Sequence, residues 1–445
     1  MRLWRRRFQH TEQARPVEGP SLPDDSTVHL VLDLALRVGE AQMAGGAGVA
    51  DVTATILAVT TAYGLPNTEV DVIYTSITVS CHRGTEAAPV TAMRVVRGRS
   101  VDYSRLAAVE DLIRRITSDG VTAADASAEI DRISRADHPY PRWVATVAWA
   151  GMAAAVAFLV GGGPLLAATA AVVTALIDRV GRVLNRRALP FFFQQVVGGA
   201  LATSVAVAMY ATDLLPAVRP SLLIATGIVV LLSGLSLVGT VQDAITGYHV
   251  TAAGRTVEIG LLTAGLIAGI TLTLRAGVQF GVQTSIADPL PPLISEVPTQ
   301  FAAGAATSAF FALASYAPVR ALPMAAVAGA VGTASYGLLV LTGTNAITSA
   351  VVAATAVGFL GKILSRRLGT PPLLVAVAGM VPLLPGWTTY RGLYQLTAEG
   401  DAAGLSTLVL AAGTALALAS GVVLGEYLGR PVRTGLGRLA ARSRR

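Results

Sequence analysis

The stretch WVATVAWAGMAAAVAFLV, residues 143–160, begins the part of the chain that decides the fold. It carries no charged side chain, and similar apolar stretches recur toward the C-terminus, separated by short polar loops. A helix needs about 20 mostly apolar residues to cross a bilayer. The chain of 445 residues is 53% hydrophobic and 14% charged, whereas soluble domains average about 25% charged residues. This composition predicts a polytopic α-helical membrane protein and argues against a soluble enzyme or a disordered chain.

Ten segments have close to the length that a transmembrane helix requires. An even number of spans places both ends of the membrane domain on one side of the bilayer. The expected spans are 143–161, 164–181, 190–211, 220–241, 255–275, 301–317, 322–341, 345–363, 371–388 and 404–427.

The basic residues between these spans predict the orientation, because cytoplasmic loops of membrane proteins are enriched in Lys and Arg. With the N-terminus in the cytoplasm, the outer loops hold only Arg219, Arg275 and Arg391. We therefore expect a multi-pass protein of the inner (cell) membrane with both termini cytoplasmic, and the net charge of +7 reflects this side rather than nucleic-acid binding. The residues on the cytoplasmic side are Arg132, Arg135, Arg142, Arg179, Arg182, Arg186, Arg187, Arg255, Arg320, Lys362, Arg366, Arg367 and the tail after Arg430.

A proline-rich segment, residues 276–300, divides the spans into two groups of five, residues 139–275 and 301–430. Five spans per half would give the halves opposite orientations if they are repeats. Both halves pass through Thr-Ala-x-Gly before their last span, and an interruption precedes each of these turns, Leu232-Ser233-Gly234 and Leu384-Pro385-Gly386. Interrupted spans at matching positions of inverted repeats are typical of transporters and point to the binding site.

The chain before the spans has a mixed composition and predicts a small cytoplasmic α+β domain over residues 26–138. A basic, disordered arm over residues 1–25 precedes it, and a basic cytoplasmic tail over 431–445 ends the chain. Cys81 is the single cysteine, which excludes an internal disulfide and a multi-cysteine metal site; no cofactor is expected. The periodicities predict helices at 27–43, 50–63, 102–117 and 122–134, and strands at 70–80 and 91–96.

A set of short motifs, in this order along the chain, resembles the threonine/serine exporter family. The resemblance covers nearly the whole chain beyond about residue 25 and includes both parts of the family, which occur as separate chains in a related system linked to succinate export. It implies proton-motive-force-driven efflux of small hydroxylated amino acids. The first interruption departs from the family by lacking a Pro-Gly. The motifs are Gly39-Glu40, Gly45-Gly46-Ala47-Gly48, Tyr63-Gly64-Leu65, Thr78-Val79-Ser80, Arg105-Leu106, Leu384-Pro385-Gly386 and Tyr390-Arg391-Gly392-Leu393.

A zwitterionic substrate needs donors for its carboxylate and acceptors for its ammonium, and broken helices supply both. Proton coupling needs a shielded carboxylate or histidine. Asp178 and its neighbour Arg182 also fit a plain salt bridge, and Gln195 also fits helix–helix packing. The substrate-binding candidates are Gln195, Asn345, Thr348, Pro385, Gly386 and Tyr390, and the proton-coupling candidates are Asp243, Glu258 and Asp178.

Three alternatives remain open at this point. A dicarboxylate exporter would need a cation at its site, and a membrane-anchored hydrolase would use the N-terminal domain, for example His82; a regulatory membrane protein would bind a partner there. The loop Gly45–Gly48 fits a plain turn better than a phosphate cradle, because Asp51 would repel an anion. Small-residue stripes at Gly265–Gly269 and Gly421–Gly429 indicate close helix packing, within one chain or between the chains of a homo-oligomer.

Overall fold

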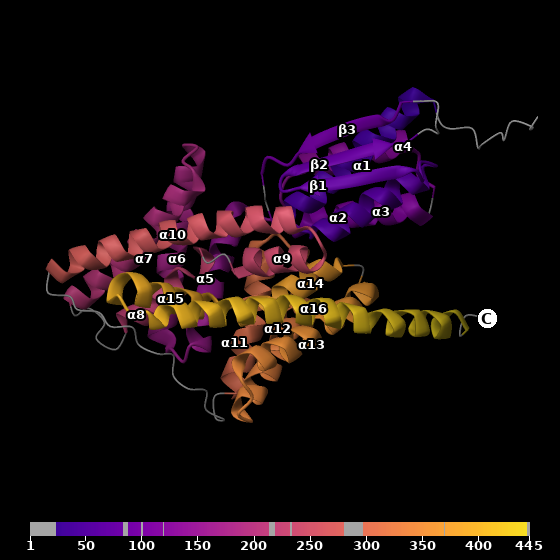
Figure 1. Ribbon diagram of the computed structural model, residues 1–445. Helices are drawn as coiled ribbons and strands as arrows, with labels where there is room; N and C mark the ends of the chain where they lie inside the picture. The colour runs from indigo at the N-terminus through magenta and orange to yellow at the C-terminus, as the bar shows by residue number, and fades with distance from the viewer. Residues whose placement is uncertain are drawn as a thin grey trace, which may run out of the picture.

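The computed structural model describes residues 24–82, 88–98, 101–118, 120–212, 219–231, 234–279, 297–368 and 370–442, without the side chains of 234, 279, 366–368, 393, 397–398 and 430–442. Residues 1–23 of the expected arm, most of the segment 276–300 and residues 232–233 of the first interruption fall outside these ranges, whereas Asp24 and Asp25 of the expected arm cap and begin α1. The described chain is mostly helical, with one small sheet (Figure 1).

Residues 24–135, called the N-terminal domain below, form a three-stranded antiparallel sheet in the order β1-β2-β3, packed against four helices. Alternate residues of β2 are buried against these helices, as period-two burial requires. The predicted helix at 122–134 is present as α4, and the Thr122 side chain caps its start by accepting the Asp125 backbone N–H. The elements are α1 (Asp25–Ala44), α2 (Val49–Ala62), β1 (Thr68–Ile73), β2 (Ser76–Cys81), β3 (Val90–Val95), α3 (Tyr103–Ser118) and α4 (Ala123–Arg135).

The prediction of one strand over residues 70–80 is wrong. The chain turns at Tyr74 and Thr75, and β1 and β2 pair as a hairpin with Ile73 opposite Ser76. Tyr74 adopts a left-handed conformation, φ 55°, which is unusual for a bulky side chain. The segment contains no Gly, Pro, Asn or Asp at the turn, so it lacks the residues that normally indicate one.

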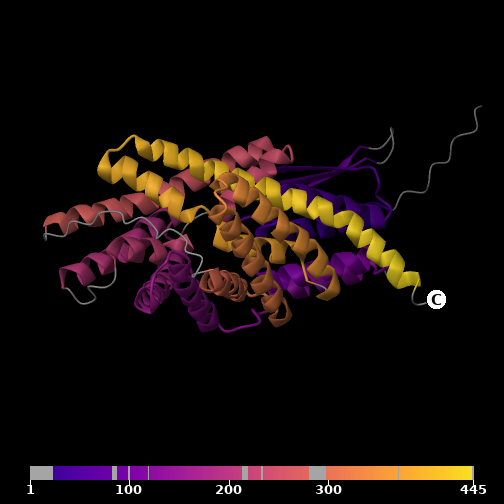
Figure 2. The same ribbon diagram turned by 90° about the horizontal axis from the view of Figure 1, so that it is seen from below.

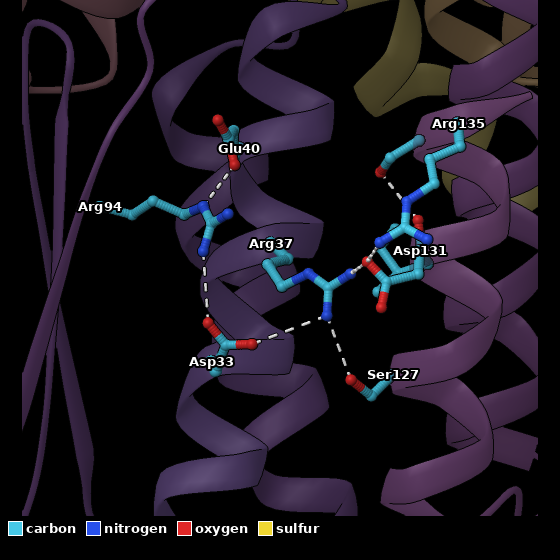
Figure 3. A network of polar contacts seen from close by, with 9 residues as sticks. Asp33, Arg37, Glu40, Arg94, Ser127, Asp131 and Arg135 are labelled. Carbon is cyan, nitrogen blue, oxygen red and sulfur yellow. Dashed lines mark hydrogen bonds and ion pairs between the residues drawn. The ribbon is translucent and has the colours of Figure 1, made fainter.

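Ion pairs join α1 to both of its neighbours (Figure 3). Arg37 on α1 binds Asp131 on α4 and donates to Ser127 at 3.1 Å. Arg94 on β3 binds Glu40 and, at 3.2 Å, Asp33, both on α1. Because these side chains are partly exposed, the ion pairs add little to the free energy of unfolding. Their main effect is to orient α1 between the sheet and α4.

Seven helices of the described chain are long and apolar enough to cross a membrane, and the number rises to nine if each of two bent pairs is one span. This supports a polytopic helical membrane protein. The number does not reach the expected ten. The helix α11 is not among those counted, because it begins with Val297, Pro298, Thr299 and Gln300 and is not apolar enough over its length. The helices are α5 (Arg142–Leu159), α6 (Pro164–Arg186), α7 (Phe191–Ala211), α8 (Pro220–Gly227), η1 (Val229–Leu231), α9 (Gly234–Ile245), α10 (His249–Gln279), α11 (Val297–Ala314), η3 (Val319–Ala321), α12 (Leu322–Leu341), α13 (Ala346–Leu368), α14 (Pro372–Met380), η4 (Val381–Leu383), α15 (Gly386–Tyr394), η5 (Gln395–Glu399) and α16 (Ala403–Arg442).

The two groups of membrane helices pack in the same order. In the first, α5 packs on α6, α6 on α7 and α7 on α10, while α8 contacts α5, α6 and α7. In the second, α11 packs on α12, α12 on α13 and α13 on α16, while α14 contacts α11, α12 and α13. The two groups meet where α5 lies against α11, with Trp149 and Phe311 in edge-to-face contact at 5.9 Å. Each element therefore has a counterpart with equivalent neighbours.

The small-residue stripes pack within the chain. Gly265 and Gly269 of α10 face the backbone of α7, and Gly421 and Gly425 of α16 face the backbone of α13. These helix pairs occupy equivalent places in the two groups. Small residues let helix backbones approach closely in a membrane. In each group, glycines therefore let the last long helix pack closely against the helix it contacts.

The helix α16 is longer than its expected span, and the predicted tail continues it as far as Arg442. Its C-terminal end lies at the same end of the molecule as the N-terminal domain in both views (Figures 1 and 2). The helix α10 is longer too and begins at His249, beside that domain. The N-terminal domain thus sits over one end of the membrane helices, with the C-terminus beside it.

Candidate functional site

Each group contains one broken span. The pair α8–η1 and α9 bends by 52°, and the pair α14–η4 and α15 bends by 45°. The break in the second pair holds Pro385 and Gly386, as the sequence predicts. Val229 and Val230 of η1 pack in the same apolar cluster as Val381 of η4. The residues that precede the two breaks, about 150 residues apart in the chain, therefore pack in one apolar cluster of the bundle.

Gln195 lies beside the first break. Its Nε2 donates to the Leu231 carbonyl at 3.3 Å, and its Oε1 is buried without a partner among the described residues. It lines a cavity of about 220 Å³ between α6, α7 and η1. A buried amide oxygen without a hydrogen-bond donor is unfavourable unless water or a ligand supplies one. Gln195 therefore remains a candidate substrate-binding residue.

Tyr390 lies on α15, the helix that follows the second break. It is 5% exposed and packs with α7, α8 and α10 of the first group. The rings of Trp387 and Tyr394 lie on either side, at 5.9 and 6.1 Å from its ring. Asn345 and Thr348 lie elsewhere, exposed at the start of α13, where Asn345 Oδ1 accepts the Thr348 N–H at 2.8 Å. Gln195, Pro385, Gly386 and Tyr390 thus gather around the breaks, and the other two cap a helix.

Asp243 joins the membrane helices to the N-terminal domain. Its side chain is buried and pairs with the Arg255 guanidinium, and its Oδ1 accepts the Val49 N–H at 3.0 Å. Val49 is the first residue of α2, so the carboxylate lies at the positive end of that helix. The loop Gly45–Gly48 is the turn that presents this helix end, as expected, and Asp243 takes the place an anion would have.

The β1–β2 hairpin rests on the start of α10. The Tyr74 N–H donates to Thr251 Oγ1 at 2.9 Å, and that hydroxyl donates to the Val72 carbonyl at 3.2 Å. The Tyr74 hydroxyl donates to Glu258 at 3.2 Å, and Tyr248 reaches Thr53 on α2 at 3.1 Å. The Thr-Ala-x-Gly segment that the sequence singles out lies at the start of α10 rather than in a turn. It is part of a contact between the N-terminal domain and the membrane helices, called the α9–α10 joint below.

Replacing Thr251 with valine is expected to lower the free energy of unfolding by about 1–3 kcal/mol, because the Tyr74 N–H loses its acceptor while the shape is kept. The measurement is thermal unfolding of the purified full-length protein, combined with limited proteolysis at the hairpin. Thr256→Val is the matched control, because Thr256 is exposed one turn away and bonds only its own helix among the described contacts. Equal stability of the two variants would contradict the joint.

Asp178 lies at the end of α6 in a compact polar cluster. Its Oδ2 accepts Thr146 Oγ1 at 2.7 Å and Arg182 at 2.7 Å. Arg182 also donates to Thr146 at 2.6 Å. This is the salt-bridge arrangement that the sequence left open, and it connects α5 to α6.

The sequence did not single out a second polar site, a cavity of about 420 Å³ where the N-terminal domain meets α13, α14 and α16. Its charged lining residues are Asp51, Glu110, Arg114, Lys362 and Glu426. The signal that could have found it is Lys362, the only lysine in a chain with 34 basic residues. Lys362 lies within α13, next to the apolar residues of that helix, rather than in a loop.

Burial raises the pKa of Glu110, on α3, to about 7; Asp51 adds to the shift, and Arg114 and Lys362 oppose it. The folded protein therefore holds this proton to a higher pH than the unfolded chain, and stability falls as pH rises from about 4.5 to about 7.

Glu110→Gln is expected to remove this fall and to be about 1–3 kcal/mol more stable than the parent at pH 8. The check is thermal unfolding at pH 5.5 and pH 8, with exposed Glu69→Gln as the control; parallel pH profiles of parent and Glu110→Gln would refute it.

Two broken spans inside a bundle of apolar helices, with a polar cavity at one end, define a multi-pass membrane transporter. Two family models extend this: one for threonine/serine exporters matches residues 33–277, and "Threonine/Serine exporter, ThrE" matches residues 300–428. The chain belongs to the threonine/serine exporter family and is a transporter rather than an enzyme.

Two curated relatives cover almost the whole chain. It is 44% identical, over 434 residues, to the "Probable threonine/serine exporter" of Mycobacterium tuberculosis, covering 94% of this chain and 79% of the relative. It is 37% identical, over 429 residues, to the "Threonine/serine exporter" of Corynebacterium glutamicum, covering 95% of this chain and 88% of the relative. No solved structure matches the chain.

Proposed function

We propose that this chain is a secondary exporter that moves threonine and serine out of the cytosol, driven by the proton motive force across the inner membrane. The observation that carries the proposal is that the residues before the two helix breaks pack in one apolar cluster, inside a bundle whose two groups pack alike. Half-helix ends and unwound backbone at such breaks bind charged substrate groups. The names of the two relatives supply the substrate class.

In this proposal the membrane domain has ten spans in two inverted repeats, with α11 as the sixth. The α16 end and the N-terminal domain lie at the same end of the molecule (Figure 1), which agrees with an even number of crossings. In this proposal that end is cytoplasmic, because the ten-span order puts the basic residues near the ends of α6 and α13 on the same side as the N-terminal domain. These residues are Arg186, Arg187, Lys362, Arg366 and Arg367. The substrate lies between the breaks, near Gln195, Pro385, Gly386 and Tyr390.

Proton coupling in this proposal uses the carboxylates that bind across helices. Asp178 of α6 accepts from Thr146 of α5, Asp243 pairs with Arg255, and Glu258 accepts from the Tyr74 hydroxyl. Protonating any of these acids weakens a contact that holds two elements together. A proton entering from outside can thus loosen the α9–α10 joint or the α5–α6 contact and let the bundle change its opening.

The test is efflux from cells that lack their own exporters, express this chain and are loaded with threonine-containing peptide. We expect threonine and serine to appear outside, and an uncoupler to stop them. Cells with empty vector control for leakage, and membrane fractions confirm the protein's location. Absence of threonine and serine efflux from cells with membrane-located protein would overturn the proposal.

A dicarboxylate exporter is the second candidate, and the same experiment tests it by following succinate. A dicarboxylate needs cationic partners. In the cavity of about 420 Å³ where the N-terminal domain meets the membrane helices, the carboxylates of Asp51, Glu110 and Glu426 outnumber Arg114 and Lys362. This favours a zwitterion, and succinate efflux without threonine or serine would reverse that preference.

A further inference from the structure

The 420 Å³ cavity runs from the N-terminal domain along one face of α14. This face comprises Pro372, Leu373, Ala376, Val377 and Met380, and Met380 directly precedes η4, the short helix that leads into the break. A bulk water occupies roughly 30 Å³, so the cavity has room for a small amino acid with several waters. It connects the cytosolic end of the membrane domain to the broken span.

One wall residue of this cavity has an unmet hydrogen-bonding need. Gln42 on α1 is 6% exposed, and its Oε1 has no partner among the described residues. Buried polar atoms are almost always paired with protein, water or a ligand. An ammonium or hydroxyl group in the cavity would provide the missing donor.

The cavity also holds charges of both signs, contributed by both parts of the molecule. The N-terminal domain supplies Asp51, Glu110 and Arg114, and the membrane helices supply Lys362 and Glu426. Lys362 of α13 and Glu110 of α3 thus line the same cavity from the two parts of the molecule. A cation and a carboxylate on facing walls match the two ends of an α-amino acid, whereas a dicarboxylate would meet an excess of carboxylates.

We propose that this cavity is the cytosolic loading site for the exported amino acid, in which Lys362 binds the substrate carboxylate and Glu110 with Gln42 binds its ammonium. The apolar face of α14 leaves space for a short side chain and leads it toward the break. The site exists only when the N-terminal domain is docked, so docking and substrate loading are linked. This inference rests on the proposed export function.

The first test uses the uniqueness of Lys362. Purified full-length protein is treated with an amine-acylating reagent, and the modification of Lys362 is followed by mass spectrometry of the peptide that contains it. We expect threonine and serine to slow the modification several-fold, while succinate and ethanolamine do not. Ethanolamine lacks the carboxylate and corrects for reagent consumed by the ligand's amine. Equal rates with all four compounds would overturn the inference.

The second test measures threonine binding and efflux in variants. Loss of a charge-assisted contact is expected to weaken binding about 10- to 100-fold in Lys362→Met and Glu110→Gln, with partial recovery in Lys362→Arg. Gln42→Leu removes the unpaired oxygen and is expected to weaken binding about 5- to 10-fold. Arg275→Gln, exposed and far from the cavity, and Glu69→Gln serve as controls.

The outcomes separate the two proposals. Parental protein that exports neither threonine nor serine overturns the proposed function. Normal parental export, with unchanged binding and efflux in Lys362→Met, Glu110→Gln and Gln42→Leu, overturns the loading site alone. If one variant fails to accumulate, the acylation test on the parental protein still decides.

Discussion

Asp243→Asn is expected to abolish most efflux and to lower the free energy of unfolding by about 3–5 kcal/mol. The substitution keeps an oxygen for the Val49 N–H but leaves the buried Arg255 guanidinium without this counter-charge. Removing one member of a buried ion pair is far more costly than replacing both. Thermal unfolding of the purified protein and efflux from loaded cells measure the two effects.

The double variant Asp243→Asn with Arg255→Met is the informative comparison. It removes both charges, so it should be more stable than Asp243→Asn alone. Glu129→Gln, which removes an acid paired with the exposed Arg132, is the control and should change stability by less than about 1 kcal/mol. If Asp243→Asn behaves like Glu129→Gln, the buried pair does not hold the α9–α10 joint.

Gly269→Val is expected to prevent accumulation of folded protein. A Cβ at Gly269 would overlap the Val196 carbonyl oxygen of α7 and lie 2.9 Å from the Ala200 nitrogen. Backbone atoms cannot rotate away as a side chain does, so α7 and α10 must separate, at a cost of about 3 kcal/mol or more. Size-exclusion chromatography of the tagged protein from membranes measures the yield of monodisperse material.

Gly260→Val is the matched control for this effect. Gly260 lies on the same helix, is exposed, and has no described atom within 4 Å of a Cβ built on it. Both variants have the same change in helix propensity and hydrophobicity, so a difference between them reports the helix contact. Equal yields and equal unfolding temperatures would show that α7 and α10 do not pack through Gly269.

The membrane helices could be predicted closely because their signal is local. The expected span 322–341 coincides with α12, and Pro141, Gly163 and Pro190 precede α5, α6 and α7 as expected of helix starts. A helix satisfies its own backbone hydrogen bonds, so an apolar run of sufficient length is enough to specify it in a membrane. Pro385-Gly386 likewise marked the second break by its own chemistry.

The β1–β2 hairpin shows where local reasoning fails. Tyr74 and Thr75 carry no turn signal, and the left-handed Tyr74 is held by Thr251 and Glu258, about 180 residues away. The same holds for Asp243, which the sequence marks only as an acid near a turn. Its partner at the start of α2 precedes it by 194 residues.

The sequence by itself determined the two-part composition, the positions of most helices, the second break and the family. Only the tertiary structure decided that the residues before the two breaks share one apolar cluster, that the glycine stripes pack within the chain, and that Gln42, Glu110 and Lys362 line one cavity. The physical reason is the distance along the chain over which each signal acts. Hydropathy and capping act within one or two helical turns, whereas burial of a polar group depends on which distant faces meet, and no local pattern specifies that pairing.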